Sequence, residues 1–276
     1  MKIQSLSVVV PGKNCINNCL CCVSRMSADD KQYKNQLEDN LAFYDLYLND
    51  YIKRLGFCRD NGCNTLMLTG NIEPQQNRRF LVDFGIMMRL MEHPFRNIEM
   101  QTTGVLIDNP MLRFLRNHVG VNTIALSLFS FDNDENQKCR GSTNLPLNIV
   151  DFCKQVKLYD FNLRLCINLT KFFHEPEIFD YAKELGADQV TLRKLYDAND
   201  GSPQSQWVKE NRLDDDSYRF LHSRIKGYSI LRKLEYGQEA RNIDGMSVIL
   251  DDDCMAKKES QDFKYLIIRP NGKLYG

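Results

Sequence analysis

Four cysteines lie within eight residues near the start of the sequence, in the segment Cys15-Ile16-Asn17-Asn18-Cys19-Leu20-Cys21-Cys22. Cys15, Cys19 and Cys22 have the spacing C-x3-C-x2-C. Thiolates are the soft ligands that iron-sulfur clusters require, and a short loop lets three of them converge on one centre. Because a cubane has four irons, three cysteines leave one iron open to a small molecule. The spacing predicts a 4Fe-4S cluster with an open site, and the alternative interpretation is a zinc knuckle or a group of buried thiols.

Three further segments carry residues that suit a small polar ligand. The segment Thr69-Gly70-Asn71-Ile72-Glu73-Pro74 follows an apolar run. Its carboxylate, on Glu73, suits an ammonium group, and Gly70 allows the backbone to approach a ligand closely. The other two segments are Gln101-Thr102-Thr103-Gly104 and Ser127-Leu128-Phe129-Ser130-Phe131-Asp132.

The cysteine motif and these segments, in this order, resemble the motifs of the radical S-adenosylmethionine superfamily. The resemblance extends over most of the first 195 residues. It implies that the three cysteines ligate a 4Fe-4S cluster and that S-adenosyl-L-methionine chelates the open iron. It also implies that Gly70 and Glu73 bind the methionine amino group of this cofactor, and that Ser127 and Asn168 hold its ribose or carboxylate.

Two arginines are further candidates for the cofactor site. A guanidinium offers a planar fork to a carboxylate, so Arg140 and Arg193 are each expected to pair with the cofactor carboxylate, the alternative being a surface salt bridge. The sequence departs from the family pattern at two positions. Cys21 replaces an aromatic residue and leaves open which adjacent thiol binds the cluster, although the family spacing selects Cys22. Ile72 stands where a second glycine is common.

The resemblance also implies a reaction. A reductant such as flavodoxin or ferredoxin would reduce the cluster, and cleavage of S-adenosylmethionine would give a 5'-deoxyadenosyl radical that abstracts hydrogen from a substrate. The 36 basic and 36 acidic side chains cancel, so no global field favours phosphate contacts, and a small metabolite or nucleotide is the preferred substrate. The alternatives are RNA or peptide modification by the same chemistry, an activase that makes a glycyl radical on a partner, or a non-catalytic iron-sulfur protein for electron transfer or sensing.

The elements that must position these residues follow an alternating order. Apolar runs rich in β-branched residues alternate with helical patterns, as expected of βαβ units and a parallel sheet. We expect strands at about 6–10, 65–68, 98–102, 123–129, 163–169 and 189–195, and helices including 37–58, 147–158 and 177–185. This order predicts an α/β fold, a partial (β/α)6 TIM-like barrel. The candidate residues then fall at the C-terminal strand ends, where such barrels carry their active sites.

A C-terminal extension is expected to pack on the same domain. The barrel core covers 1–195 and the extension 196–276. Within the extension we predict a polar loop at 198–212 that contains Trp207, a helix at 214–226, and strands near 247–250 and 265–268 that lengthen the sheet at its far edge. Trp207 has two interpretations, a contact to substrate or a side chain that holds the loop in place.

The remaining cysteines have simpler interpretations. Cys58 and Cys63, together with Cys139 or Cys254, form a possible auxiliary cluster, but dispersed cysteines more often mean buried thiols without a metal. Ten cysteines without a recognisable export signal point to a reducing compartment. The first apolar run is too short for a signal peptide, and no run is long enough to span a membrane, so we expect a cytoplasmic protein.

Overall fold

A computed structural model describes residues 2–26, 48–142, 144–174, 177–234, 238–251 and 263–276. The first part of the helix predicted at 37–58 lies outside the described residues, and the rest is found as α4, Leu48–Asp60. Among the described residues, no helix is both long enough and apolar enough to cross a membrane.

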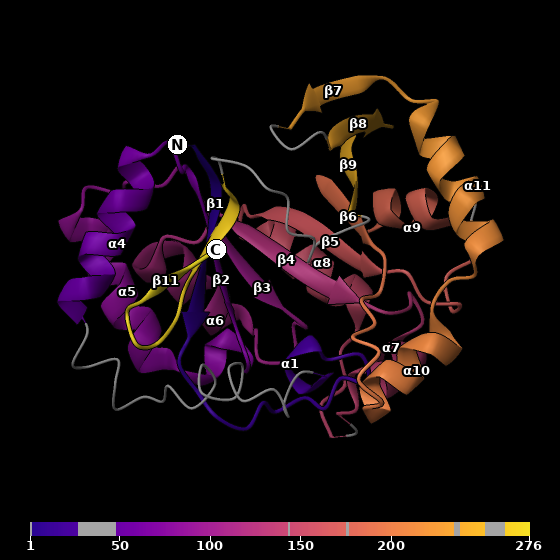
Figure 1. Ribbon diagram of the computed structural model, residues 1–276, viewed down its shortest axis with the longest axis horizontal. Helices are drawn as coiled ribbons and strands as arrows, with labels where there is room; N and C mark the ends of the chain where they lie inside the picture. Colours follow the sequence, from indigo (N-terminus) through magenta and orange to yellow (C-terminus); the bar gives the residue numbers. More distant parts are fainter. Residues whose placement is uncertain (1, 27–47, 143, 175–176, 235–237, 252–262) are drawn as a thin grey trace.

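All six predicted strands are confirmed. They are β1 Ile3–Val10, β2 Thr65–Gly70, β3 Asn97–Thr102, β4 Thr123–Leu128, β5 Asn162–Asn168 and β6 Gln189–Arg193. Each pairs in parallel with the next along the chain, from β1 to β6. Helices connect them, which makes the α/β partial barrel that the alternation predicts. Figure 1 shows the strands side by side with helices around them.

The helices begin and end where local capping chemistry allows. Helix α7, Asn133–Arg140, begins after Asp132, whose side chain accepts a hydrogen bond from the amide of Glu135, and it ends before Gly141 in the left-handed conformation. The other helical elements are α1 Val23–Met26, the 3-10 turn η1 Pro74–Gln76, α5 Arg78–Leu90, α6 Asn109–Phe114, the π-helical turn η2 Leu115–Val119, α8 Ile149–Leu158, α9 Ile178–Glu184, α10 Pro203–Asn211 and α11 Asp215–Lys226.

The two faces of the parallel sheet differ in polarity. On β5, Leu163, Leu165 and Ile167 are fully buried in the core that the helices cover. Arg164 and Cys166 alternate with them and therefore point to the opposite, concave face. The apolar face holds the barrel together, and the concave face is left for polar groups.

The predicted loop at 198–212 is wrong, because residues 203–211 form α10. Its helix begins after Ser202, whose hydroxyl accepts a hydrogen bond from the amide of Ser205 at 3.1 Å, and Pro203 occupies the first position. Trp207 and Val208 pack with Met26 of α1 and with Leu195, which follows β6 in the chain. The segment is short and polar, so its sequence does not indicate a helix, and tertiary packing stabilises the helix that forms.

The strands of the extension lie on both edges of the sheet, not only on the far edge as predicted. The order is β11-β10-β1-β2-β3-β4-β5-β6-β9-β8-β7. The predicted strand at 247–250 is β9, Met246–Asp251, which pairs in parallel with β6. The strand at 265–268 is β10, Phe263–Ile268, which pairs in parallel with β1 because β9 already takes the edge of β6. The remaining strands are β7 Ile230–Lys233, β8 Glu239–Ile243 and β11 Leu274–Tyr275.

Candidate functional site

The loop that carries the cysteines leaves the carboxyl end of β1 and is tied to two distant elements. Backbone amides of Asn18 and Leu20 donate to the carbonyls at the end of α7, over 2.9 and 3.0 Å. On the other side, the Gln76 side chain accepts from the amide of Ile16 at 3.0 Å and donates to the carbonyl of Asn14 at 3.2 Å. Figure 1 places α1, α7 and α10 at the same end of the sheet. The cysteine loop is therefore held in place by its neighbours.

The four thiols of the loop lie close enough together for their charges to interact, Cys21 included. Burial raises the pKa of Cys15, and raises that of Cys19 well above its usual range. The charges of Glu73 and Cys22 add to both increases, which places these groups near one another. Among the described residues, no three His, Cys, Asp or Glu side chains are grouped closely enough for a single ion.

Cys21 has different surroundings. It packs against an apolar cluster of Met26, Leu195 and Val208, which Trp207 also covers. Burial raises the pKa of its thiol to about 12. Cys21 thus contacts apolar side chains, whereas the C-x3-C-x2-C spacing selects Cys22 as the expected third ligand. Trp207 and Cys21 thus pack against the same apolar cluster.

Glu73 lies at the centre of a buried hydrogen-bond network. Its side chain is 5% exposed. The Thr102 hydroxyl donates to Oε2 at 2.6 Å, the Thr103 amide donates to Oε1 at 3.1 Å, and the Asn17 side-chain amide donates to Oε1 at 3.1 Å. Burial raises the pKa of Glu73, while these hydrogen bonds and the charge of Arg140 oppose the increase. The network joins the cysteine loop to the ends of β2 and β3.

Gly70 ends β2 directly beside the start of the cysteine loop. It pairs with Val10 across the strands, and a Cβ built at this position would lie 3.1 Å from the Val10 carbonyl oxygen. A side chain here would press on the backbone of β1. Glycine at this position therefore lets the ends of β1 and β2 lie close together. Glu73 follows three residues later in the sequence.

The structure places Ser127, Asn168 and Arg193 on the concave face of three adjacent strands. Asn168 lies opposite Arg193 in the register of β5 and β6. Ser127 lies opposite Cys166, which precedes Asn168 by two residues and so shares its face. The Asn168 amide donates to the carbonyl of Leu128 at 3.2 Å, which fixes the side chain at the end of β4. The register therefore brings these three residues to one concave surface.

Arg140 lies behind the cysteine loop and is the largest fully buried side chain that the structure describes. Its guanidinium donates to the Ser142 hydroxyl at 3.1 Å and to the Leu145 carbonyl at 3.2 Å. Burial lowers its pKa, and the charges of Cys19 and Glu73 act in the opposite direction. Arg140 thus brings a buried positive charge to the cysteine loop.

The base of the concave face holds an ion pair that the sequence analysis missed. Arg164 contacts Glu99 at 2.6 Å, and its guanidinium also donates to Gln189 Oε1 at 2.6 and 2.8 Å. The bridge runs from β3 to β6 across Ala125, whose small side chain leaves room. The sequence signal for this ion pair was the polar residue at every second position of otherwise buried strands.

Removing one partner of this ion pair is expected to destabilise the fold. Arg164→Met leaves the carboxylate of Glu99, which is 2% exposed, without its cation, and we expect the free energy of unfolding to fall by roughly 3–5 kcal/mol. Arg59→Met is the control, because the Arg59–Asp60 pair is exposed to solvent and contributes little to stability. Urea denaturation of both variants measures the difference, and equal losses would contradict the prediction.

The other described cysteines are buried, and Cys139 contacts the loop through its backbone carbonyl. Cys58 and Cys63 are in the apolar core, and burial raises their pKa values to about 12 and about 11. Cys139 is buried on α7, where burial raises its pKa to about 12. Cys254 lies outside the described residues. The described thiols have the properties of buried cysteines.

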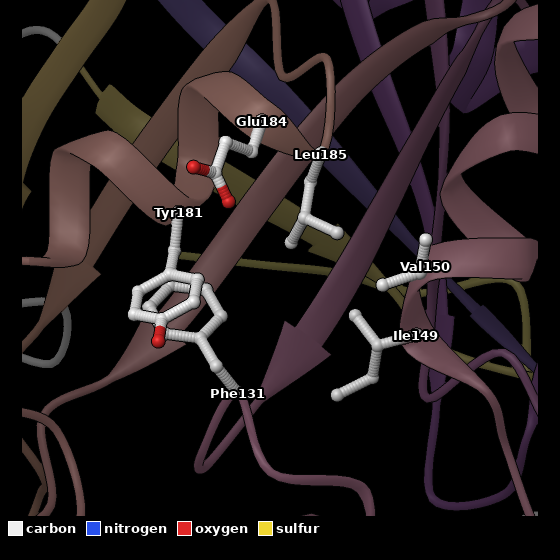
Figure 2. A pocket seen from close by; sticks show the side chains of 6 residues that line it. All are labelled: Phe131, Ile149, Val150, Tyr181, Glu184 and Leu185. Carbon is white, nitrogen blue, oxygen red and sulfur yellow. The ribbon is translucent and has the colours of Figure 1, made fainter.

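A separate apolar pocket of about 320 Å³ lies between α8 and α9. Figure 2 shows that its side chains face one another from the two helices and from the segment after β4. The rings of Phe131 and Tyr181 stack at 5.1 Å, and Glu184 is its one acidic lining residue. The remaining lining residues are Ile149, Val150 and Leu185. None of the candidate site residues contributes to this pocket.

The donor set fits an iron-sulfur cluster with a bound amino acid-like cofactor. Three thiols of one loop supply soft ligands, and Glu73 supplies an acceptor for an ammonium group. The carbonyl oxygen Oδ1 of Asn17 is buried beside this network and has no donor among the residues that the structure describes. An unsatisfied acceptor at this place is consistent with a site that a ligand completes.

Comparison with solved structures identifies the fold. Streptococcus suis SuiB bound to S-adenosylmethionine has a TM-score of 0.61 and 15% identity, over 99% of this chain and 60% of that chain. Escherichia coli coproporphyrinogen III oxidase (HemN), described as a radical SAM enzyme, has a TM-score of 0.50 and 14% identity, over 81% of this chain and 51% of that chain. The chain has the radical S-adenosylmethionine fold.

The likeness is one of structure and not of sequence. Native anSMEcpe with bound AdoMet shows the same radical S-adenosylmethionine fold, with a TM-score of 0.50 and 15% identity, over 70% of this chain and 52% of that chain. The present chain spans no more than about 60% of the length of these three structures. No protein-family model and no curated protein sequence matches it.

Proposed function

We propose that this protein is a radical S-adenosylmethionine enzyme that reductively cleaves its cofactor at a 4Fe-4S cluster. The observation that carries the proposal is the cysteine loop, which leaves β1, holds its thiols close enough together for their charges to interact, and is tied to the buried Glu73. The fold supports it, because structures of this fold are described with bound S-adenosylmethionine. When bound, the cluster supplies the electron, and the cofactor supplies the 5'-deoxyadenosyl radical that removes hydrogen from the substrate.

The residues of this chain orient the cofactor and exclude competing reactions. Cys15, Cys19 and Cys22 hold the cluster. Gly70 and Glu73 hold the methionine amino group, with Glu73 fixed in orientation by the threonines at the end of β3.

The concave face provides the remaining cofactor contacts. Ser127 and Asn168 hold the ribose or carboxylate. A guanidinium, from Arg193 on this face or from Arg140 behind the loop, compensates the charge of the carboxylate.

The substrate proposed is a small metabolite or nucleotide. Support comes from the polar base of the concave face, where the Glu99–Arg164 ion pair suits a polar molecule better than an apolar one. A peptide is the second candidate, because one structure of this fold is SuiB bound to its precursor peptide SuiA. Either reaction requires an external reductant such as flavodoxin or ferredoxin.

The proposal is tested by anaerobic reconstitution with iron and sulfide, reduction, and addition of S-adenosylmethionine. We expect 5'-deoxyadenosine, measured by mass spectrometry, in an amount that depends on the reductant. Candidate small-molecule and peptide extracts are then compared for their effect on its rate of formation. A full, reducible cluster that gives no 5'-deoxyadenosine with any extract would favour the electron-transfer or sensing alternative.

A further inference from the structure

Asn17 occupies the middle of the cysteine loop, two residues from both Cys15 and Cys19. Its side chain is 2% exposed, in a loop whose neighbours Ile16 and Asn18 are exposed. A buried carboxamide in an otherwise exposed loop requires hydrogen-bond partners for both of its ends.

The nitrogen end of this carboxamide is fully engaged. Nδ2 donates to Glu73 Oε1 at 3.1 Å and to Thr103 Oγ1 at 2.9 Å. The carboxylate of Glu73 already accepts hydrogen bonds from the Thr102 hydroxyl and the Thr103 amide. Because an ionised carboxylate only accepts, the amide nitrogen and not the carbonyl oxygen must face Glu73. The orientation of the Asn17 side chain is therefore fixed by its partners.

The oxygen end has no donor in the part of the chain that the structure describes. Oδ1 of Asn17 is buried and makes no hydrogen bond to any described residue. Leaving a buried acceptor unsatisfied costs about 1–3 kcal/mol. Because Oδ1 and Nδ2 are bonded to the same carbon, this acceptor lies immediately beside the group that contacts Glu73. A donor delivered next to Glu73 would satisfy it.

We infer that Asn17 is a cofactor-binding residue whose Oδ1 accepts a hydrogen bond from the amino group of S-adenosylmethionine. This inference rests on the proposed function, which brings that amino group to Glu73. The two residues then have complementary roles: Glu73 compensates charge, and Asn17 provides a neutral acceptor on the loop that also holds the cluster. Asn17 thereby links the position of the cofactor to the position of the thiols.

The experiment compares two ligands on cluster-loaded protein. One is S-adenosyl-L-methionine, and the other is the analogue in which hydrogen replaces the α-amino group. Equilibrium dialysis gives Kd for both ligands on the native protein, on Asn17→Ala and on Asn18→Ala. Asn18 is the matched control, because it has the same side chain in the same loop but is exposed. Iron and sulfide content is measured first for every variant.

We expect Asn17→Ala to weaken S-adenosylmethionine binding by about tenfold, a loss of ~1.4 kcal/mol, and to leave the analogue unaffected. Asn18→Ala should bind both ligands like the native protein. An equal weakening of both ligands would mean that Asn17 only shapes the loop or binds a buried water, and it would overturn the inference. No weakening of either ligand would overturn it as well.

Two further results separate this inference from the proposed function. If Asn17→Ala loses its cluster, the two ligands are compared on Asn17→Leu instead, because leucine keeps the volume of the side chain. We expect the same result, weaker binding of S-adenosylmethionine and unchanged binding of the analogue. A native protein that binds S-adenosylmethionine with the Asn17-dependent preference but never cleaves it would contradict the proposed function alone. A native protein that does not bind S-adenosylmethionine would overturn both.

Discussion

Replacing Cys22 with alanine is expected to abolish cluster binding, whereas Cys21→Ala is expected to retain the native iron content. The physical reason is the difference between the two adjacent thiols. Cys21 packs against the apolar cluster beneath α10, and burial raises its pKa to about 12. Cys22 adds charge to the environment of both Cys15 and Cys19. Burial raises the pKa of Cys19 as well, so the choice rests on position: the charge of Cys22 acts on both Cys15 and Cys19, whereas that of Cys21 acts on Cys19.

The comparison is made on anaerobically reconstituted protein by iron and sulfide analysis together with the absorption spectrum. Cys22→Ala should also form no 5'-deoxyadenosine, whereas Cys21→Ala should form it. Thermal unfolding of both proteins without metal provides the folding control. The assignment is wrong if the Cys21 variant loses the cluster while the Cys22 variant keeps a full, active one.

Gly141→Ala is expected to disrupt the cysteine loop from a position 120 residues away in sequence. Gly141 ends α7 with φ of 60°, and a Cβ built there would lie 2.3 Å from the carbonyl oxygen of Asn18. The left-handed conformation alone costs an alanine roughly 1–2 kcal/mol. The clash is with backbone, which a rotamer change cannot relieve. We therefore expect a larger loss of stability than this and a reduced cluster content.

Gly186→Ala is the matched control for this change. Gly186 also follows a helix, with φ of 75°, but its Cβ would meet only Lys157 Cγ at 3.6 Å. This variant should lose about 1–2 kcal/mol and keep its full iron content. Urea denaturation and iron analysis of the two variants separate conformational strain from the effect on the loop. Equal losses in both proteins, with both clusters intact, would show that contact between α7 and the loop is unimportant.

Local patterns were enough to predict the barrel strands because each is a short buried run followed by a helix start. The same method failed for α10, where Ser202 and Pro203 give a clear start signal but the segment is polar and only its packing on α1 makes it a helix. The same method also predicted β10 at the wrong edge of the sheet. Which strand pairs with which is decided by contacts between residues far apart in sequence, and no local pattern encodes them.

For the candidate site, the sequence likewise predicted the residues but not the contacts between them. The cysteines were selected by type, spacing and position after a strand, whereas Glu73, Ser127 and Asn168 were selected by resemblance to the family motifs. The contacts that hold them could not be selected, since Asn17 reaches partners 56 and 86 residues away. The burial of Arg140 could not be predicted either, because an isolated arginine is normally on the surface.

The pairing of β1 with both β2 and β10 has a consequence for biosynthesis. β1 leaves the ribosome before the other described strands of this sheet, and β10 leaves it after all of them except β11. Until residue 268 has emerged, one edge of β1 presents unpaired amides and carbonyls, and the loop that follows it is anchored to an incomplete sheet. Maturation of the metal centre is therefore expected to follow translation, and nascent chains would need protection from strand-to-strand aggregation before then.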